Sequence, residues 1–180
     1  MIYNDVKMKE MEKIMELIIR QAVPDDAAEL LEFLRRVGAE TDNLSFGAEG
    51  VPFSVEAEAE FIASQTDSQD GVMLVASLNG RIVGNASLAR LSGRMSHRAE
   101  FSVAVLKEYW GRGIGGALLK SAVAIAQDRG IELIELSVRS DNERAKQLYG
   151  RAGFKCFGQH PAFFKINGDP IAFDYMYLEL

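Results

Sequence analysis

The sequence has little of what several classes of protein require. One cysteine, Cys156, among 180 residues excludes an internal disulfide and cannot by itself build a metal site. The longest apolar runs, such as residues 72–76, are far too short to span a bilayer, and charges near the N-terminus leave no secretory signal segment. We therefore expect a cytoplasmic protein that contacts no membrane and binds no metal.

A surplus of basic residues is also missing. The formal net charge of −6 argues against nucleic-acid binding, because such binding needs basic residues clustered on one face. The same charge mildly favours a cationic substrate. No repeat or linker divides the chain, so we expect one domain over residues 15–180, preceded by a charged, methionine-containing extension over residues 1–14.

Glycine, in contrast, is concentrated in one short stretch. Four glycines fall within six residues: Gly111, Gly113, Gly115 and Gly116. They separate an expected strand, residues 100–106, from an alanine-rich helical run that continues to Asp128. Glycine lets the backbone approach a ligand closely, and the start of a helix offers unpaired N–H groups and a positive dipole end. The stretch therefore predicts a site that binds phosphate groups.

Three other interpretations of these glycines compete. Gly111, Gly113 and Gly116 match the G-x-G-x-x-G pattern of dinucleotide-binding proteins, and Glu135 lies about where a ribose-binding acid is expected. However, residues 107–110 separate the strand from the loop, and too little chain follows for a doubly wound domain. A P-loop is excluded because no Gly-Lys-Ser/Thr follows. A glycine turn that serves only tight packing of a strand on a helix stays open.

The order of elements predicts a single α/β (α+β) domain with a mixed, mostly antiparallel central sheet flanked by helices. We expect strands at 16–23, 72–78, 81–91, 100–106, 131–138, 154–157 and 171–180, and helices at 24–38, 55–65, up to 128 and up to 151. Asn79-Gly80 predicts a tight hairpin between two of these strands, and Gly38 is expected to close the first helix. The strand at 100–106 should connect through the central helix to a parallel neighbour at 131–138.

Two motifs then carry a resemblance to a known family. The first is Val103-Ala-Val105 followed by Trp110-Gly-Arg-Gly-Ile-Gly-Gly116. The second is Asn142-Glu-Arg-Ala-Lys-Gln-Leu-Tyr-Gly-Arg-Ala-Gly-Phe154. In this order they resemble the GNAT family, the acetyl-CoA-dependent N-acetyltransferases, over about residues 16–180. One position departs from the family pattern, because the loop commonly begins with Gln or Arg where this chain has Trp110.

The resemblance implies acetyl-CoA as co-substrate and assigns residues to it. The backbone of Val103 and Val105 would bind the pantetheine arm. The pyrophosphate would be bound by the loop residues Trp110, Gly111, Arg112, Gly113, Ile114, Gly115 and Gly116. Asn142 would cap its helix beside the cofactor arm, a role that Asp141 could share by position alone.

Catalytic roles are implied in the same way. Tyr149 resembles the family's general acid, because a phenol stays protonated at neutral pH and can protonate a departing thiolate. Glu100 is the candidate base that takes the proton of the amine, often through water; the alternative from the residues is a salt bridge between Glu100 and Arg98.

The implied reaction is direct transfer of the acetyl group to a primary amine. Acidic residues between 40 and 60, together with Glu100-Phe-Ser, which is similar to spermidine acetyltransferases, favour a small-molecule amine or polyamine. A protein N-terminus or lysine, and a non-catalytic CoA-binding sensor on the same fold, are the alternatives. The resemblance also makes a homodimer an expectation.

Overall fold

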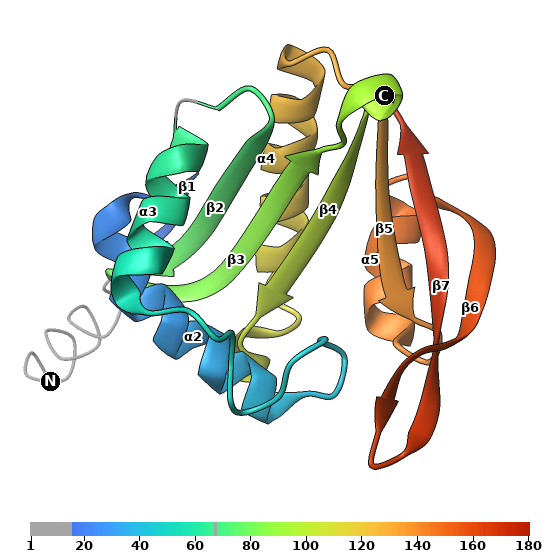
Figure 1. The fold of residues 1–180 in the computed structure, drawn as a ribbon, viewed down its shortest axis with the longest axis horizontal. Coiled ribbons are helices and arrows are strands. Elements are labelled where there is room, and N and C mark those ends of the chain that lie inside the picture. Colours follow the sequence, from blue (N-terminus) through green and yellow to red (C-terminus); the bar gives the residue numbers. More distant parts are fainter. Residues whose placement is uncertain (1–15, 67) are drawn as a thin grey trace, which may run out of the picture.

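A seven-stranded sheet organises the protein, seen here in a computed structural model that describes residues 16–66 and 68–180 (Figure 1). Its strands are β1 (Leu17–Gln21), β2 (Gly71–Leu78), β3 (Arg81–Arg90), β4 (Arg98–Val105), β5 (Leu133–Arg139), β6 (Lys155–Ile166) and β7 (Asp169–Glu179). The helices are α2 (Ala27–Glu40), α3 (Val55–Thr66), α4 (Ile114–Asp128) and α5 (Glu143–Arg151), with short 3-10 turns at Pro24–Asp26, Gly93–Met95 and Lys107–Tyr109. The expected extension over residues 1–14 lies outside the described residues.

The strand order β1-β2-β3-β4-β5-β7-β6 confirms the predicted fold class. Neighbouring strands pair antiparallel, except β4 and β5, which pair in parallel and are connected through α4. A parallel pair needs such a long crossover connection. In the described part of the chain, no helix is long and apolar enough to cross a membrane.

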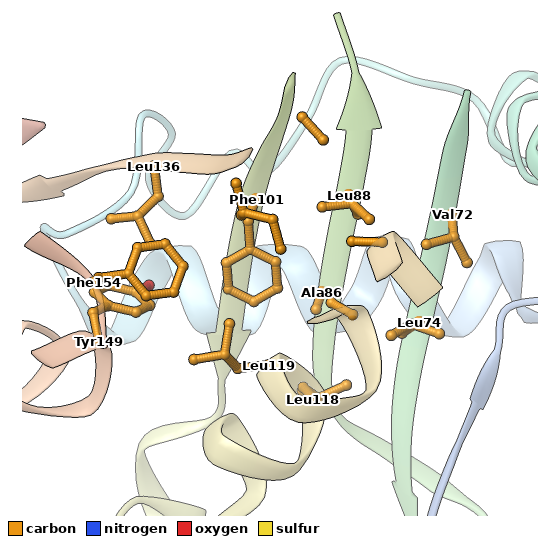
Figure 2. Close-up of a cluster of buried hydrophobic side chains, with 14 of the residues drawn as sticks. Val72, Leu74, Ala86, Leu88, Phe101, Leu118, Leu119, Leu136, Tyr149 and Phe154 are labelled. Atoms are coloured by element: carbon orange, nitrogen blue, oxygen red, sulfur yellow. The ribbon is translucent and has the colours of Figure 1, made fainter. Parts of the chain in front are cut away.

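Two apolar layers lie on the two faces of the sheet. β2 is buried along its whole length, and its side chains alternate between the layers: Val72, Leu74 and Ala76 join the cluster with α4, whereas Met73 and Val75 join the cluster with α2. This alternation follows from the two-residue period of a strand. Figure 2 shows the first layer, which continues across β3, β4 and β5 to α5.

Glycine positions explain two features of these elements. Asn79 and Gly80 have φ angles of 51° and 79°, which is the left-handed geometry that a two-residue hairpin needs, and the predicted β2–β3 hairpin is confirmed. The prediction that Gly38 closes the first helix is wrong, because α2 continues to Glu40. A Cβ at Gly38 would lie 2.1 Å from the Gly47 carbonyl oxygen, so this glycine instead lets the loop after α2 pack directly on the helix.

The last two strands are longer at their shared end than predicted. β6 continues past Phe157 to Ile166, and a second Asn-Gly turn at Asn167 and Gly168, with φ angles of 51° and 91°, joins it to β7. Pro161 lies in β6 where the pairing with β7 is irregular, between His160 and Phe164. A proline in a strand pattern argues against a strand, which is why this half of the hairpin was missed.

Candidate active site

The central cleft arises because β4 and β5 separate. They pair only at residues 98–100 and 133–135; beyond these, β4 stays paired with β3 and β5 with β7 (Figure 1). A cleft of about 1290 Å³ is lined by both strands, by the loop that precedes α4 and by α5. Two strand edges therefore face a shared space with backbone groups that the sheet itself does not pair.

The backbone of β4 presents alternate residues to this space. The Trp110 indole N–H donates to the Val105 carbonyl over 2.7 Å, whereas the N–H of Leu106 donates to Val83 on β3 over 3.0 Å. Because successive residues of a strand point their N–H and C=O groups to opposite edges, the backbone groups of Val103 also point away from β3. The family resemblance implies that these two valines bind the cofactor, and their geometry is compatible with that prediction.

Glycines in the loop before α4 are required by backbone angle rather than by crowding. Gly111 and Gly113 have φ angles of 79° and 80°, and an added Cβ at either would meet no atom within 4 Å. An added Cβ at Gly115 or Gly116 would come no closer than 3.4 Å to its nearest neighbour, Leu148, which is ordinary contact. The alternative that these glycines serve only tight packing is therefore not supported.

The first turn of α4 presents backbone N–H groups to the cleft. Its first helical hydrogen bond runs from the Ala117 N–H to the Gly113 carbonyl over 3.0 Å, so the preceding N–H groups have no acceptor within the helix. Gly113, Ile114, Gly115 and Gly116 line the cleft. Free N–H groups and the positive dipole end fit a phosphate group, which is the group that acetyl-CoA would bring here.

Trp110 and Arg112, the two bulky residues of the loop, are placed differently. Trp110 and Gly111 line the cleft, as predicted for cofactor contacts. Arg112 is not among the lining residues, and its guanidinium lies over the Tyr109 ring, 5.2 Å from the centroid. Of the predicted cofactor residues, Arg112 is thus the one that the structure does not bring to the cleft.

α5 carries the second motif to the opposite wall. The Asn142 side-chain oxygen accepts from the Ala145 N–H over 3.2 Å, so Asn142 rather than Asp141 caps the helix. Tyr149 lines the cleft but is only 6% exposed, and its ring lies 5.6 Å from that of Phe154 (Figure 2). Burial disfavours the phenolate and raises the pKa of Tyr149 to about 12, so its hydroxyl keeps a proton at neutral pH.

Charged residues gather where the two strands still pair. Glu100 lines the cleft on β4, directly opposite Glu135 on β5. Arg98 pairs with Glu135, and not with Glu100, so the predicted alternative of a Glu100–Arg98 salt bridge is wrong. The Arg98 guanidinium contacts a residue of the neighbouring parallel strand β5 rather than one of its own strand β4. The same pairing engages Glu135, which the dinucleotide interpretation needed for a ribose.

The segment between 40 and 60 lines part of the cleft, but not with the acidic residues that favoured a polyamine. Its lining residues are Thr41, Asn43 and Leu44. The Glu40 carboxylate instead accepts the Lys107 N–H over 2.7 Å, and Glu58 is buried in α3, where desolvation raises its pKa. No acid between 40 and 60 is therefore among the residues that line the cleft.

An aromatic wall of the cleft was not among the residues predicted from the sequence. Phe157, Phe163 and Tyr175 from the β6–β7 hairpin line the cleft, with the rings of Phe157 and Tyr175 stacked 5.9 Å apart. Phe157 and Phe163 are 59% and 40% exposed, which is unusual for large apolar side chains. The aromatic pair Phe163-Phe164 was a usable signal, but only once the hairpin was recognised.

Comparisons with known proteins agree with this geometry. Residues 28–154 match the family model described as Acetyltransferase (GNAT) family. An uncharacterized N-acetyltransferase of Mycobacterium tuberculosis is 34% identical over 102 residues, which are 57% of this chain and 64% of that protein. The L-amino acid N-acetyltransferase AaaT of Escherichia coli is 30% identical over 105 residues, 57% of this chain and 65% of that protein. The matches thus span slightly under two thirds of these relatives.

Solved structures give a similar result. The acetyltransferase of GNAT family from Streptococcus pneumoniae superimposes with a TM-score of 0.88 at 33% identity, covering 92% of this chain and 100% of that one. A GNAT superfamily phosphinothricin acetyltransferase from Sinorhizobium meliloti, solved in complex with acetyl-CoA, has a TM-score of 0.79 at 22% identity, covering 92% and 89%, and shows the shared fold. The chain belongs to the acetyltransferase (GNAT) family.

Proposed function

We propose that the protein is an N-acetyltransferase that transfers an acetyl group from acetyl-CoA to a primary amine by direct attack. The observation that carries this proposal is the cleft between the separated strands β4 and β5, with the glycine loop at the start of α4 in its lining. Family membership supports an acetyl-CoA-dependent acyltransferase, and the Sinorhizobium relative was solved with acetyl-CoA bound.

The residues present fit this co-substrate. The N–H groups at the start of α4 would hold the pyrophosphate, and the exposed edge of β4 at Val103 and Val105 would pair with the amide-containing arm as an added strand would. The Val105 carbonyl accepts the Trp110 indole N–H, and the Val105 N–H and both backbone groups of Val103 would be available to the arm. Acetyl-CoA, when bound, supplies an activated thioester.

Tyr149 and Glu100 would move the two protons of the reaction. The buried Tyr149 phenol holds its proton far above neutral pH and would donate it to the departing sulfur. Glu100, on the cleft surface and not paired with Arg98, would accept the proton of the incoming ammonium, directly or through water. A phenol and a carboxylate on separate elements thus provide an acid and a base.

The aromatic wall indicates the class of acceptor. Phe157, Phe163 and Tyr175 favour a primary amine attached to an apolar or aromatic body, because aromatic surfaces bury such groups well. A polyamine loses support, since the acids between 40 and 60 are not among the lining residues. An amino-acid-like amine with an apolar side chain suits this wall, and the Escherichia coli relative is named for L-amino acids.

The test is release of free CoA from acetyl-CoA in the presence of aromatic and apolar amino acids, spermidine and a peptide with a free N-terminus. We expect Glu100→Gln to lower the rate at least about tenfold, and most at low pH, where free amine is scarce. Glu32→Gln, at an exposed position outside the cleft, is the matched control.

Each outcome decides between alternatives. A pH profile of Glu100→Gln that matches the wild type would remove Glu100 as the base. A preference for spermidine would contradict the acceptor class. CoA binding without transfer to any amine would instead support the non-catalytic sensor.

A further inference from the structure

We propose that Arg144, rather than the predicted Arg112, is the arginine that binds the phosphate groups of CoA, and that Trp110 positions it. The inference rests on the proposed function, because it concerns the same co-substrate. It arises from an arrangement of side chains in the lining of the cleft that neither sequence motif requires, since position 144 is unspecified in the Asn-x-x-Ala pattern.

The Trp110 side chain is anchored to strand β4. Its indole N–H donates to the Val105 carbonyl at the last residue of β4, over 2.7 Å. This hydrogen bond links the loop to the strand edge and restricts the orientation of the ring. An indole held in this way is a rigid surface, unlike the flexible amide or guanidinium that the resemblance led us to expect there.

Arg144 lies on that surface. Its guanidinium carbon is 4.8 Å from the centroid of the Trp110 ring, within the range of a cation–π interaction. Such stacking restricts a long side chain without using its N–H donors, so the planar fork remains free for a bidentate contact. Trp110 therefore pre-positions a cation that it does not neutralise.

The position of Arg144 suits an anion. It occupies the first turn of α5, and it lines the same cleft as the first turn of α4. Both helix starts contribute positive dipole ends, and the arginine adds a full charge near them. Arg112 is also stacked on an aromatic ring, that of Tyr109, but it is not among the residues that line the cleft.

Two arginines, each stacked on an aromatic ring beside the same loop, make a matched comparison. Calorimetric titration of CoA into the purified wild type, Arg144→Ala and Arg112→Ala gives the dissociation constants directly, without any activity measurement. We expect Arg144→Ala to weaken CoA at least about tenfold, as expected for loss of a charge-assisted contact, and Arg112→Ala to stay within about twofold. Arg144→Lys should recover part of the loss.

Further probes separate phosphate binding from a structural role. Pantetheine, which lacks the phosphates, should bind wild type and Arg144→Ala equally, and the loss with CoA should shrink at high salt because screening weakens charge contacts. Trp110→Phe, which keeps a ring but loses the indole N–H, should weaken CoA less than Trp110→Ala. At saturating acetyl-CoA, kcat of Arg144→Ala should match the wild type while KM rises.

The inference is overturned if Arg144→Ala binds CoA as the wild type does, if Arg112→Ala loses as much, or if pantetheine binding falls equally. These results would leave the proposed function intact, since the wild type would still bind CoA. A wild-type protein that fails to bind CoA contradicts both. Arg144→Gln is the second variant if the alanine variant does not fold.

Discussion

At the scale of single residues, the buried position of Tyr149 changes the pKa of its phenol. A tyrosine in water has a pKa near 10.0, but burial of this ring raises the pKa to about 12. The side chain nevertheless lines the cleft in which the reaction is proposed to occur, and it retains its proton there. The same burial that keeps the phenol protonated also makes it a weaker acid than a tyrosine in water.

Tyr149→Phe should therefore lower kcat about 100-fold while leaving CoA affinity within about twofold, since proton transfer by a positioned side chain contributes roughly that much. In the wild type, kcat should show no alkaline decline from this residue until the pH approaches 12. Rate profiles from pH 7 to pH 10.5 and a CoA titration measure both quantities. Wild-type turnover in the variant would remove Tyr149 as the acid.

The free energy of unfolding should also depend on pH through Tyr149. Because the native pKa is raised, the unfolded chain loses this proton first, so the contribution of Tyr149 is complete below about pH 10 and is lost as pH rises towards 12.

Residues set by a motif could be predicted from the sequence, whereas residues set by tertiary pairing could not. Asn142, Tyr149 and the loop glycines occupy fixed positions in local patterns, and they do line the cleft. Nothing local indicated that Arg98 would pair with Glu135 across a parallel strand, or that Arg144 would lie on Trp110. Their catalytic and binding roles stay predictions.

At the scale of elements, the loop before α4 depends on left-handed backbone at Gly113, the N-cap of the helix. Gly80, at the tip of the β2–β3 hairpin, has nearly the same φ angle, 79° against 80°. An added Cβ would meet no atom within 4 Å at either position. The two glycines thus share the same left-handed backbone, but only Gly113 is among the residues that line the cleft.

Gly113→Ala and Gly80→Ala should each destabilise the fold by about 1–2 kcal/mol, because left-handed backbone is costly for alanine. Only Gly113→Ala should also weaken CoA, since it disturbs the N–H groups at the start of α4. Thermal unfolding and CoA titration of both variants measure the two effects. Equal CoA affinity in the two variants would mean that the loop geometry is not part of the binding site.

Turns and strands that carry one local sequence signal were predicted correctly, whereas those that carry two conflicting signals were not. Asn79-Gly80 between two apolar runs identified one hairpin, while Asn167-Gly168 was overlooked because Pro161 interrupts the preceding strand. Gly38 looked like a helix end, but it serves the close approach of Gly47. A glycine that makes room for a distant segment cannot be distinguished by sequence from one that ends a helix.

At the scale of the whole molecule, the two halves of the sheet meet through a short parallel pairing and then diverge. The second half is tied together by the buried Asp174 on β7, which accepts hydrogen bonds from Ser140 over 2.7 Å and Gln159 over 2.9 Å and pairs with Lys146 on α5 over 3.3 Å. These bonds hold the pKa of Asp174 below its ordinary value. α5, with its cleft residues, is thereby fixed to the sheet.

The order of elements was enough to predict the architecture, because one parallel crossover within antiparallel strands leaves few arrangements. The depth of the cleft and its aromatic wall were not predictable, since they depend on where the strands stop pairing. The homodimer and the cytoplasmic location stay predictions.

Thermal unfolding of the purified protein with and without acetyl-CoA, using NADH as the control, tests the central claim most directly. At about a hundred times its dissociation constant, a ligand should stabilise the native state by roughly 2.7 kcal/mol and raise Tm by several degrees. We predict this shift with acetyl-CoA and none with NADH. No shift with acetyl-CoA, or an equal shift with NADH, would contradict the assignment of the cleft.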